Sequence, residues 1–122
     1  MKYVEIIKYY SGVNVNRSIL SKINYLDGKK NGVSINYFRS GDIESKSWYL
    51  DGKRNGEYIK YFISGDIKCK CNYIDGEVHG EYIYYYINGE VECKYYYICS
   101  NEITELDWIS YNRNIKLELL GL

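Results

Sequence analysis

The sequence of 122 residues predicts an all-β fold: an antiparallel β-meander of tandem β-hairpin repeats, about 24 residues each, in one elongated twisted sheet. The first observation behind this prediction is a tyrosine that recurs at a constant interval, at Tyr25, Tyr49, Tyr73 and Tyr97. A fixed period of this kind is typical of repeat arrays. The second observation is that apolar and polar residues alternate within each repeat, which is the pattern of a half-buried strand.

Each repeat contains two glycine-bearing segments. One reads Tyr-Leu/Ile-Asp-Gly with a second glycine four residues later, and its copies occupy 25–32, 49–56 and 73–80. The other carries a Ser-Gly or Asn-Gly pair, and its copies occupy 37–43, 61–67 and 85–91. We therefore expect two strands in each repeat, one before the Ser-Gly or Asn-Gly turn and one after it.

The turn in the middle copy must keep the apolar residues on one face. A two-residue loop at Ser64 and Gly65 would place Tyr61 opposite Lys68, whereas a three-residue loop places Tyr61 opposite Ile67. The second choice predicts a type I turn followed by a bulge at a glycine, which adopts positive φ without steric cost. The glycines assigned to this role are Gly41, Gly65 and Gly89. The other repeat glycines are assigned to longer loops that join successive repeats at 27–32, 51–56 and 75–80: Gly28, Gly32, Gly52, Gly56, Gly76 and Gly80.

With this turn, odd-numbered residues are expected to share one apolar face along the whole array. The members of this face within the repeats are Ile35, Tyr37, Ile43, Tyr49, Ile59, Tyr61, Ile67, Tyr73, Ile83, Tyr85, Val91, Tyr95 and Tyr97. One face of a single sheet must be covered. Because the sequence offers no long amphipathic helix, strong twisting or a second copy of the protein would have to cover it.

The pattern assigns residues 1–122 to a single repeat domain, with the clear repeats at 19–98. Residues 1–18 are expected to contribute to a degenerate first hairpin. Val13 and Val15 would keep the odd-numbered pattern there, and the chain would turn at Ser11-Gly12.

Residues 99–122 are expected to form a worn final repeat, because terminal repeats commonly cap an array. The segment 104–120 alternates and offers a turn at 112–114, which predicts strands. A short helix over 101–110, with Asn101 as its N-cap, is the alternative.

Charge and hydropathy narrow the classes of function. Sixteen basic residues balance sixteen acidic ones, which argues against a nucleic-acid binder and against a protein held to anionic lipid by charge alone. No apolar run approaches the roughly 18 residues that span a bilayer. Glu5 and Lys8 interrupt the segment where a signal peptide would be apolar, so we expect an intracellular, cytoplasmic protein.

The reactive side chains do not form a recognisable catalytic or metal site. His79 takes the position that asparagine holds in the other repeats, which predicts a structural role in the turn. Cysteines at the spacing of a zinc site are lacking, and buried free thiols are expected instead for Cys69, Cys71 and Cys93, with Cys99 free. The repeated aspartates precede glycine or follow it, as is common in turns. We therefore expect no enzyme activity, no metal and no cofactor.

The even-numbered face is the candidate binding surface, because it mixes aromatic and charged side chains as binding surfaces do. The residues assigned to it are Trp48, Tyr58, Phe62, Tyr82, Tyr84, Tyr86 and Tyr96. The alternative is that these tyrosines are only good strand residues. The same rings would also suit a membrane interface, which gives a second hypothesis.

The repeats resemble the MORN-repeat family, in the variant form found in bacterial and large-virus proteins, which reads Tyr-x-x-Gly-Lys-x-His-Gly followed by a tyrosine pair and a glycine. The match covers about residues 19–98, and it departs from the pattern at Val33 and Ser34. The resemblance implies a strip of β-hairpins used for protein–protein contact, with an unknown protein partner or a second copy of itself. For some members it implies lipid association or an antitoxin role. The residues that carry the match in the last two copies are Tyr49, Gly52, Lys53, Gly56, Tyr61, Gly65, Tyr73, Gly76, His79, Gly80, Tyr85, Tyr86 and Gly89.

Overall fold

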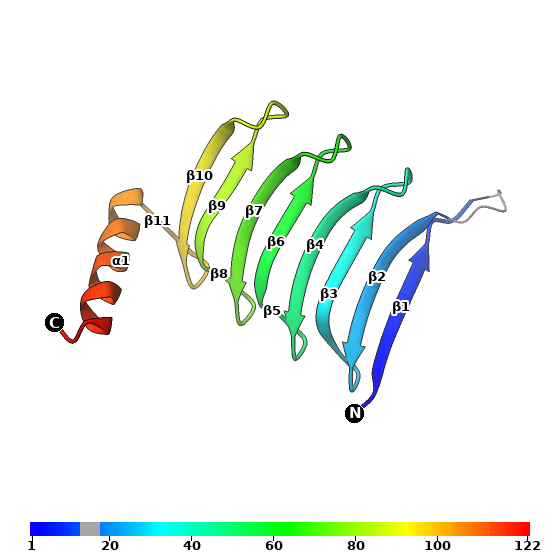
Figure 1. Ribbon diagram of the computed structural model, residues 1–122, viewed down its shortest axis with the longest axis horizontal. Coiled ribbons are helices and arrows are strands. Elements are labelled where there is room, and N and C mark those ends of the chain that lie inside the picture. Colours follow the sequence, from blue (N-terminus) through cyan, green and yellow to red (C-terminus); the bar gives the residue numbers. More distant parts are fainter. Residues whose placement is uncertain (13–17) are drawn as a thin grey trace.

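A computed structural model describes residues 1–12 and 18–122 of the chain. Over these residues, eleven strands form one open antiparallel sheet in the order of the sequence, so the predicted all-β meander is confirmed (Figure 1). The long strands are β1 (Tyr3–Tyr9), β2 (Ile19–Leu26), β3 (Lys29–Tyr37), β4 (Ile43–Leu50), β6 (Gly56–Tyr61), β7 (Ile67–Ile74), β9 (Gly80–Tyr85) and β10 (Val91–Ile98). Three short strands complete the sheet: β5 (Lys53–Arg54), β8 (Glu77–Val78) and β11 (Asn101–Ile103).

The Ser-Gly and Asn-Gly turns have the predicted register. Tyr61 pairs with Ile67, the Phe62 N–H donates to the Asp66 carbonyl at 2.8 Å, and the Gly65 N–H donates to the Phe62 carbonyl at 2.9 Å. Gly65 has a φ of 94°, a value that a side chain would strain. The same hydrogen bonds close the equivalent turns before β4 and β10.

The loops that join the repeats are shorter than predicted. Leu50 pairs with Lys53, so the chain turns through two residues only, Asp51 and Gly52, with φ of 52° and 86°. Two positive φ angles are typical of a type I′ turn, which Asp-Gly favours. The chain then bulges at Gly56, where φ is 111° and a Cβ would meet the Trp48 Cβ at 3.3 Å. The prediction of a long loop was wrong because it overlooked this turn preference.

The predicted division of the residues between the faces was also wrong. Lys60 pairs with Cys69 but Tyr61 pairs with Ile67, which leaves Lys68 as an extra residue in β7. Glu44 and Glu92 are the corresponding extra residues in β4 and β10. A bulge of one residue reverses which residues face each side, so odd-numbered residues of one strand share a face with even-numbered residues of the next.

The first hairpin is present, with β1 paired to β2 and the Tyr10 N–H bonded to the Ser18 carbonyl at 3.0 Å. The connection therefore extends beyond the predicted turn at Ser11-Gly12. Val13 and Val15, whose facing was also predicted, lie outside the described residues.

The predicted strands at 104–120 are a helix, α1 (Glu105–Leu119), which follows β11 at the C-terminal end of the sheet (Figure 1). The Thr104 Oγ1 accepts a hydrogen bond from the Asp107 N–H at 3.1 Å, so Thr104, and not Asn101, is the N-cap. The alternation after residue 114 did not reflect burial, since Leu117 and Leu119 are exposed. Residues 99–122 are therefore not a final β-repeat.

Little of this sheet is buried in the manner of a globular core. Among the described hydrophobic side chains, only Cys69, Cys71, Ile83 and Tyr96 are buried. Four serines are buried as well: Ser21, Ser34, Ser45 and Ser47. Side chains in this fold are covered by their neighbours on the same face of the sheet, because no second layer of strands packs on them among the described residues.

The turn between β10 and β11 is strained, and relieving the strain should stabilise the protein. Its two central residues, Cys99 and Ser100, have φ of 47° and 63°, where an L side chain costs about 1–2 kcal/mol per residue and asparagine costs less. We expect Cys99→Asn to raise the free energy of unfolding in urea by about 1 kcal/mol. Cys99→Ala removes the same thiol without that preference, and an equal gain from it would contradict the explanation.

Candidate binding surface

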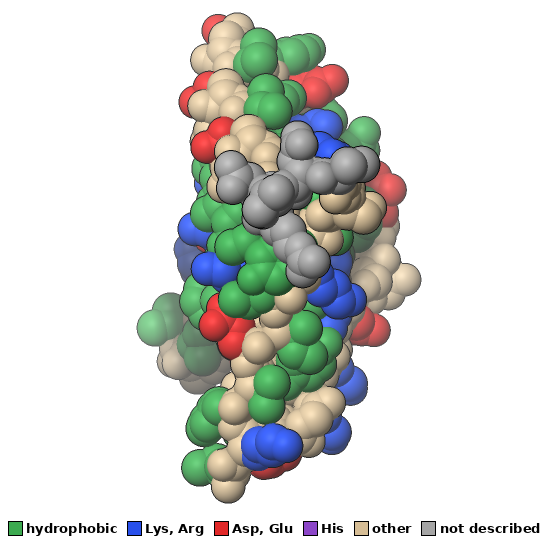
Figure 2. Space-filling view, turned by 90° about the vertical axis from the view of Figure 1, so that its right-hand side faces the viewer, with side chains coloured by type: hydrophobic (Ala, Val, Ile, Leu, Met, Phe, Trp, Pro, Cys, Tyr) green, Lys and Arg blue, Asp and Glu red, His purple; other side chains and the backbone are tan. Residues whose placement is uncertain are grey.

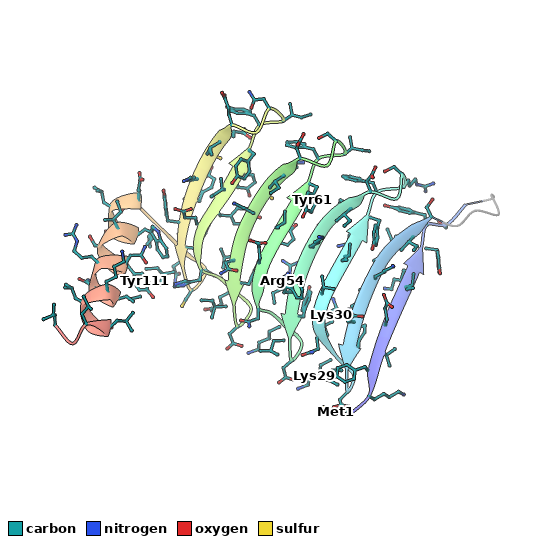
Figure 3. All side chains as sticks on the ribbon, viewed as in Figure 1. Met1, Lys29, Lys30, Arg54, Tyr61 and Tyr111 are labelled. Carbon is teal, nitrogen blue, oxygen red and sulfur yellow. The ribbon has the colours of Figure 1, made fainter. Side chains whose placement is uncertain are left out.

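A ladder of tyrosines and cations runs along one face, at the end where the repeats join. The Arg54 guanidinium donates from Nε to the Tyr49 hydroxyl at 3.3 Å and from Nη1 to the Tyr73 hydroxyl at 3.1 Å, so it links two successive repeats (Figure 3). It also lies over the Tyr73 ring at 5.2 Å. Lys30, at the equivalent position of the preceding repeat, lies over the Tyr49 ring at 4.9 Å. These cation–π contacts tie the repeats together at two successive junctions.

Small side chains occupy the middle of the same face. Pairing between neighbouring strands defines one continuous row, which reads Lys8, Ser21, Asn36, Ser45, Lys60, Cys69, Tyr84 and Cys93. We call this side of the sheet the serine–cysteine face. The Asn36 Nδ2 donates to the Ser45 Oγ at 3.1 Å, which satisfies one buried hydroxyl. Apart from the two lysines, the members before Tyr84 have small side chains, and Tyr84 is the aromatic member of the row.

Six tyrosines gather at the C-terminal half of the serine–cysteine face. The rings of Tyr82 and Tyr84 stack with their centroids 5.0 Å apart. Tyr97 contacts Tyr82 edge-to-face at 6.3 Å, and Tyr95 contacts Tyr84 in the same way at 6.1 Å. Tyr58 and Tyr73 contact each other edge-to-face at 6.3 Å. We call this set the tyrosine cluster; its members are Tyr58, Tyr73, Tyr82, Tyr84, Tyr95 and Tyr97. All six keep part of their surface exposed. Rings that hold one another in place lose little freedom when a partner binds.

The thiols beneath the cluster are poor nucleophiles. Burial raises the pKa of the Cys71 thiol to about 12, and burial raises the pKa of Cys69 as well. Burial, with the nearby Cys69 thiol as the next cause, raises the pKa of Tyr82. These groups are therefore neutral at physiological pH, which suits a packing role and not thiolate chemistry.

The opposite side of the sheet carries a row in which lysine and isoleucine alternate. Strand pairing places these residues side by side in the order Lys22, Ile35, Lys46, Ile59, Lys70, Ile83 and Lys94. We call this side the lysine–isoleucine face. Successive lysines lie two strands apart, about 9.6 Å. Tyr37 and Tyr85 flank the row, under the Lys22 and Lys70 ammonium groups at 6.0 and 5.9 Å.

Helix α1 packs at the C-terminal end of the lysine–isoleucine face. Trp108 lies over Tyr96, with ring centroids 6.3 Å apart, and Tyr111 points from the helix toward the sheet (Figure 3). The His79 ring contacts both Trp108 and Tyr111, at 5.8 and 5.7 Å. His79 was predicted to be a simple turn residue. Its position after a turn is as expected, but its ring also helps to hold the helix.

The structure does not keep the predicted binding residues together. Tyr58, Tyr82 and Tyr84 lie in the tyrosine cluster, whereas Trp48 and Tyr96 belong to the opposite face. Tyr96 is buried under the helix and is unavailable to a partner. Phe62 and Tyr86 close two of the turns at the sheet margin.

The missed members of the cluster are Tyr73, Tyr95 and Tyr97, which had been assigned to the other face. Their 24-residue spacing was visible in the sequence, but the bulges that bring them beside Tyr82 and Tyr84 were not. Counting the extra residue after each Ser-Gly or Asn-Gly turn, together with the two-residue Asp-Gly turn, would have recovered this grouping.

Among the described residues, no group of histidine, cysteine, aspartate or glutamate side chains is arranged to hold a metal ion. Within the same part of the chain, no helix combines the length and apolar character needed to cross a membrane.

Comparisons with protein-family models, with curated proteins and with solved structures find no match to this chain.

Replacing Cys71 by serine should change how stability depends on pH. The folded state disfavours the Cys71 thiolate, so its contribution is complete below the ordinary pKa of about 9 and is lost as the pH rises toward 12. Serine fills the equivalent position in the preceding repeat, Ser47, and does not titrate in this range. We expect unfolding in urea to show a smaller loss of stability between pH 8, about one unit below the ordinary thiol pKa, and pH 11, about one unit below the raised pKa, for Cys71→Ser than for the wild type. Parallel pH profiles for the two proteins would contradict this assignment.

Proposed function

We propose that this protein is a non-enzymatic protein-binding or scaffold module, and that the tyrosine cluster is its contact surface. The observation that carries the proposal is the gathering of six partly exposed rings on one face, four of them linked by contacts of 5.0 to 6.3 Å and the other two, Tyr58 and Tyr73, in contact with each other at 6.3 Å. Tyrosine is enriched in the residues that dominate binding energies at protein interfaces. The role agrees with what the resemblance to MORN repeats implies.

The opposite face supports the choice of surface. Helix α1 occupies its C-terminal end through Trp108 and Tyr96, whereas the described residues place no element over the tyrosine cluster. The cluster also continues into the small polar side chains of the first repeats. A partner that fits this face would place apolar side chains over the rings of the cluster.

Removing two stacked rings should weaken binding of such a partner. We expect the double variant Tyr82→Ser/Tyr84→Ser to bind at least tenfold more weakly than the wild type, since buried aromatic contacts at interfaces often contribute about 2 kcal/mol or more. The measurement is affinity capture from native extract with quantitative mass spectrometry, followed by titration of the captured protein.

The matched control is Tyr37→Ser/Tyr61→Ser, which removes two tyrosines from the opposite face. Circular dichroism must show the same sheet content for both variants. If both double variants bind the partner as the wild type does, the tyrosine cluster is not the contact surface. The captured protein also distinguishes a scaffold from an antitoxin-like inhibitor, since an inhibitor would capture a toxic enzyme.

Association with a membrane surface is the second candidate, and the lysine row supports it. Four lysines lie in line on one face although the net charge of the chain is zero. The acidic side chains Glu57 and Glu81 lie beside the row and reduce its positive field. This balance makes the second candidate weaker than the first.

Vesicle binding tests the second candidate. If lysines of the row contact anionic lipid, Lys46→Gln/Lys70→Gln should lower binding to phosphatidylserine-containing vesicles by roughly tenfold or more, at about 1 kcal/mol for each lysine. Lys29→Gln/Lys53→Gln removes the same charge from the turns and should have a smaller effect. Absence of sedimentation with these vesicles, for the wild type, would exclude this function.

A further inference from the structure

The N-terminal edge of the sheet presents an unpaired strand. β1 has a partner on one side only, β2, and no other described residue pairs with its outer edge. All seven residues of β1 are exposed. Figure 2 looks onto this end of the molecule and shows hydrophobic side chains along it, interrupted by charged ones. The exposed hydrophobic members of the strand are Tyr3, Val4, Ile6, Ile7 and Tyr9.

The hydrogen bonds to β2 show which backbone groups are free. The Lys2 carbonyl accepts from the Asp27 N–H at 2.9 Å, and the Tyr10 N–H donates to the Ser18 carbonyl at 3.0 Å. Even-numbered residues of β1 therefore bond inward, because an antiparallel strand alternates its bonding side. The N–H and C=O groups of the odd-numbered residues point outward: Tyr3, Glu5, Ile7 and Tyr9.

We propose that a second copy of this protein pairs with this edge, β1 against β1 in antiparallel orientation, with Ile6 on the two-fold axis. In this register Tyr3 lies opposite Tyr9 of the second copy and Glu5 lies opposite Ile7, so every outward residue meets another outward residue. Moving the axis to Glu5 would place two like charges opposite each other and shorten the pairing. The strand contains no proline, which would protect such an edge.

The other end of the sheet favours a closed pair over a fibre. There β11 pairs with the last three residues of β10, Tyr96, Tyr97 and Ile98, and α1 packs beside them. A strand of seven residues therefore lacks a complete edge to pair with at that end. Contact through β1 alone is isologous and closes after two copies. A two-fold axis normal to the sheet would also join the two serine–cysteine faces into one surface.

Proline at position 5 tests the pairing in the full chain. The Glu5 N–H faces outward, so Glu5→Pro removes a bond to the second copy while leaving the bonds to β2. We expect sedimentation velocity to show a wild-type dimer that dissociates on dilution, because one strand pair buries less than the roughly 1,600 Å² of a standard interface. Glu5→Pro should remain monomeric at the same concentrations, and Glu5→Gln should behave as the wild type. A monomeric wild type, or a series of larger oligomers, would overturn the proposal.

A disulfide test does not depend on how proline affects folding. In a Cys99→Ser background, Ile6→Cys should form a covalent dimer under mild oxidation, because directly opposed residues at a non-hydrogen-bonded position have Cβ atoms about 4.5–5.5 Å apart. The control is Ile63→Cys, a position in a distant turn that is more exposed than Ile6, at 66% against 41%. Equal amounts of covalent dimer from the two variants would show that β1 is not the interface. This inference does not rest on the tyrosine cluster, so a failed capture experiment would leave it standing.

Discussion

A sheet that has no second layer must bury its side chains against one another, and this constraint shapes the rest of the molecule. Only four of the described hydrophobic side chains are buried, and two of these are cysteines. The stabilising contacts are therefore rows of neighbours on one face, such as Tyr49, Arg54 and Tyr73. Each repeat contacts mainly the repeats beside it, so stability should grow as a sum of neighbour terms, as in other repeat proteins.

The same constraint separates the two faces chemically. One face needs small residues under tyrosines, and the other alternates long lysine stems with isoleucine, whose apolar surface those stems cover. Five of the six aspartates lie in the turns, where Asp51 and Asp75 pair with Lys29 and Lys53. The net charge of the chain is therefore zero although the lysine–isoleucine face carries a row of four lysines. Composition alone could not show this separation, because it depends on which residues the bulges bring together.

The sequence was sufficient for the repeat, the meander and the three glycine-bulge turns, because these follow from local spacing and from the conformational freedom of glycine. It was insufficient for the faces, because a single extra residue such as Lys68 leaves the alternating pattern intact while reversing its direction. It was also insufficient for the C-terminal segment. There Ile115, Leu117 and Leu119 alternate with polar residues as in a strand, yet the segment is a helix. Trp108 and Tyr111 of this helix contact His79, a residue distant in sequence. Of the residues predicted for the binding surface, Tyr58, Tyr82 and Tyr84 belong to the tyrosine cluster, whereas the other three tyrosines of the cluster had been assigned to the opposite face.

The bulges also determine how an array of this kind can change its length. In each complete repeat, odd and even positions exchange faces twice, once at the one-residue bulge beside the Ser-Gly or Asn-Gly turn and once across the two-residue Asp-Gly turn, so the facing of the side chains is restored after every 24 residues. Duplication or loss of a whole unit would thus preserve both surfaces, and would change the width of the sheet in steps of about 9.6 Å. Insertion of a single residue in a strand would exchange the two surfaces beyond that point. The repeat therefore tolerates gain or loss of whole 24-residue units, whereas a change in length within a unit would mix the two faces.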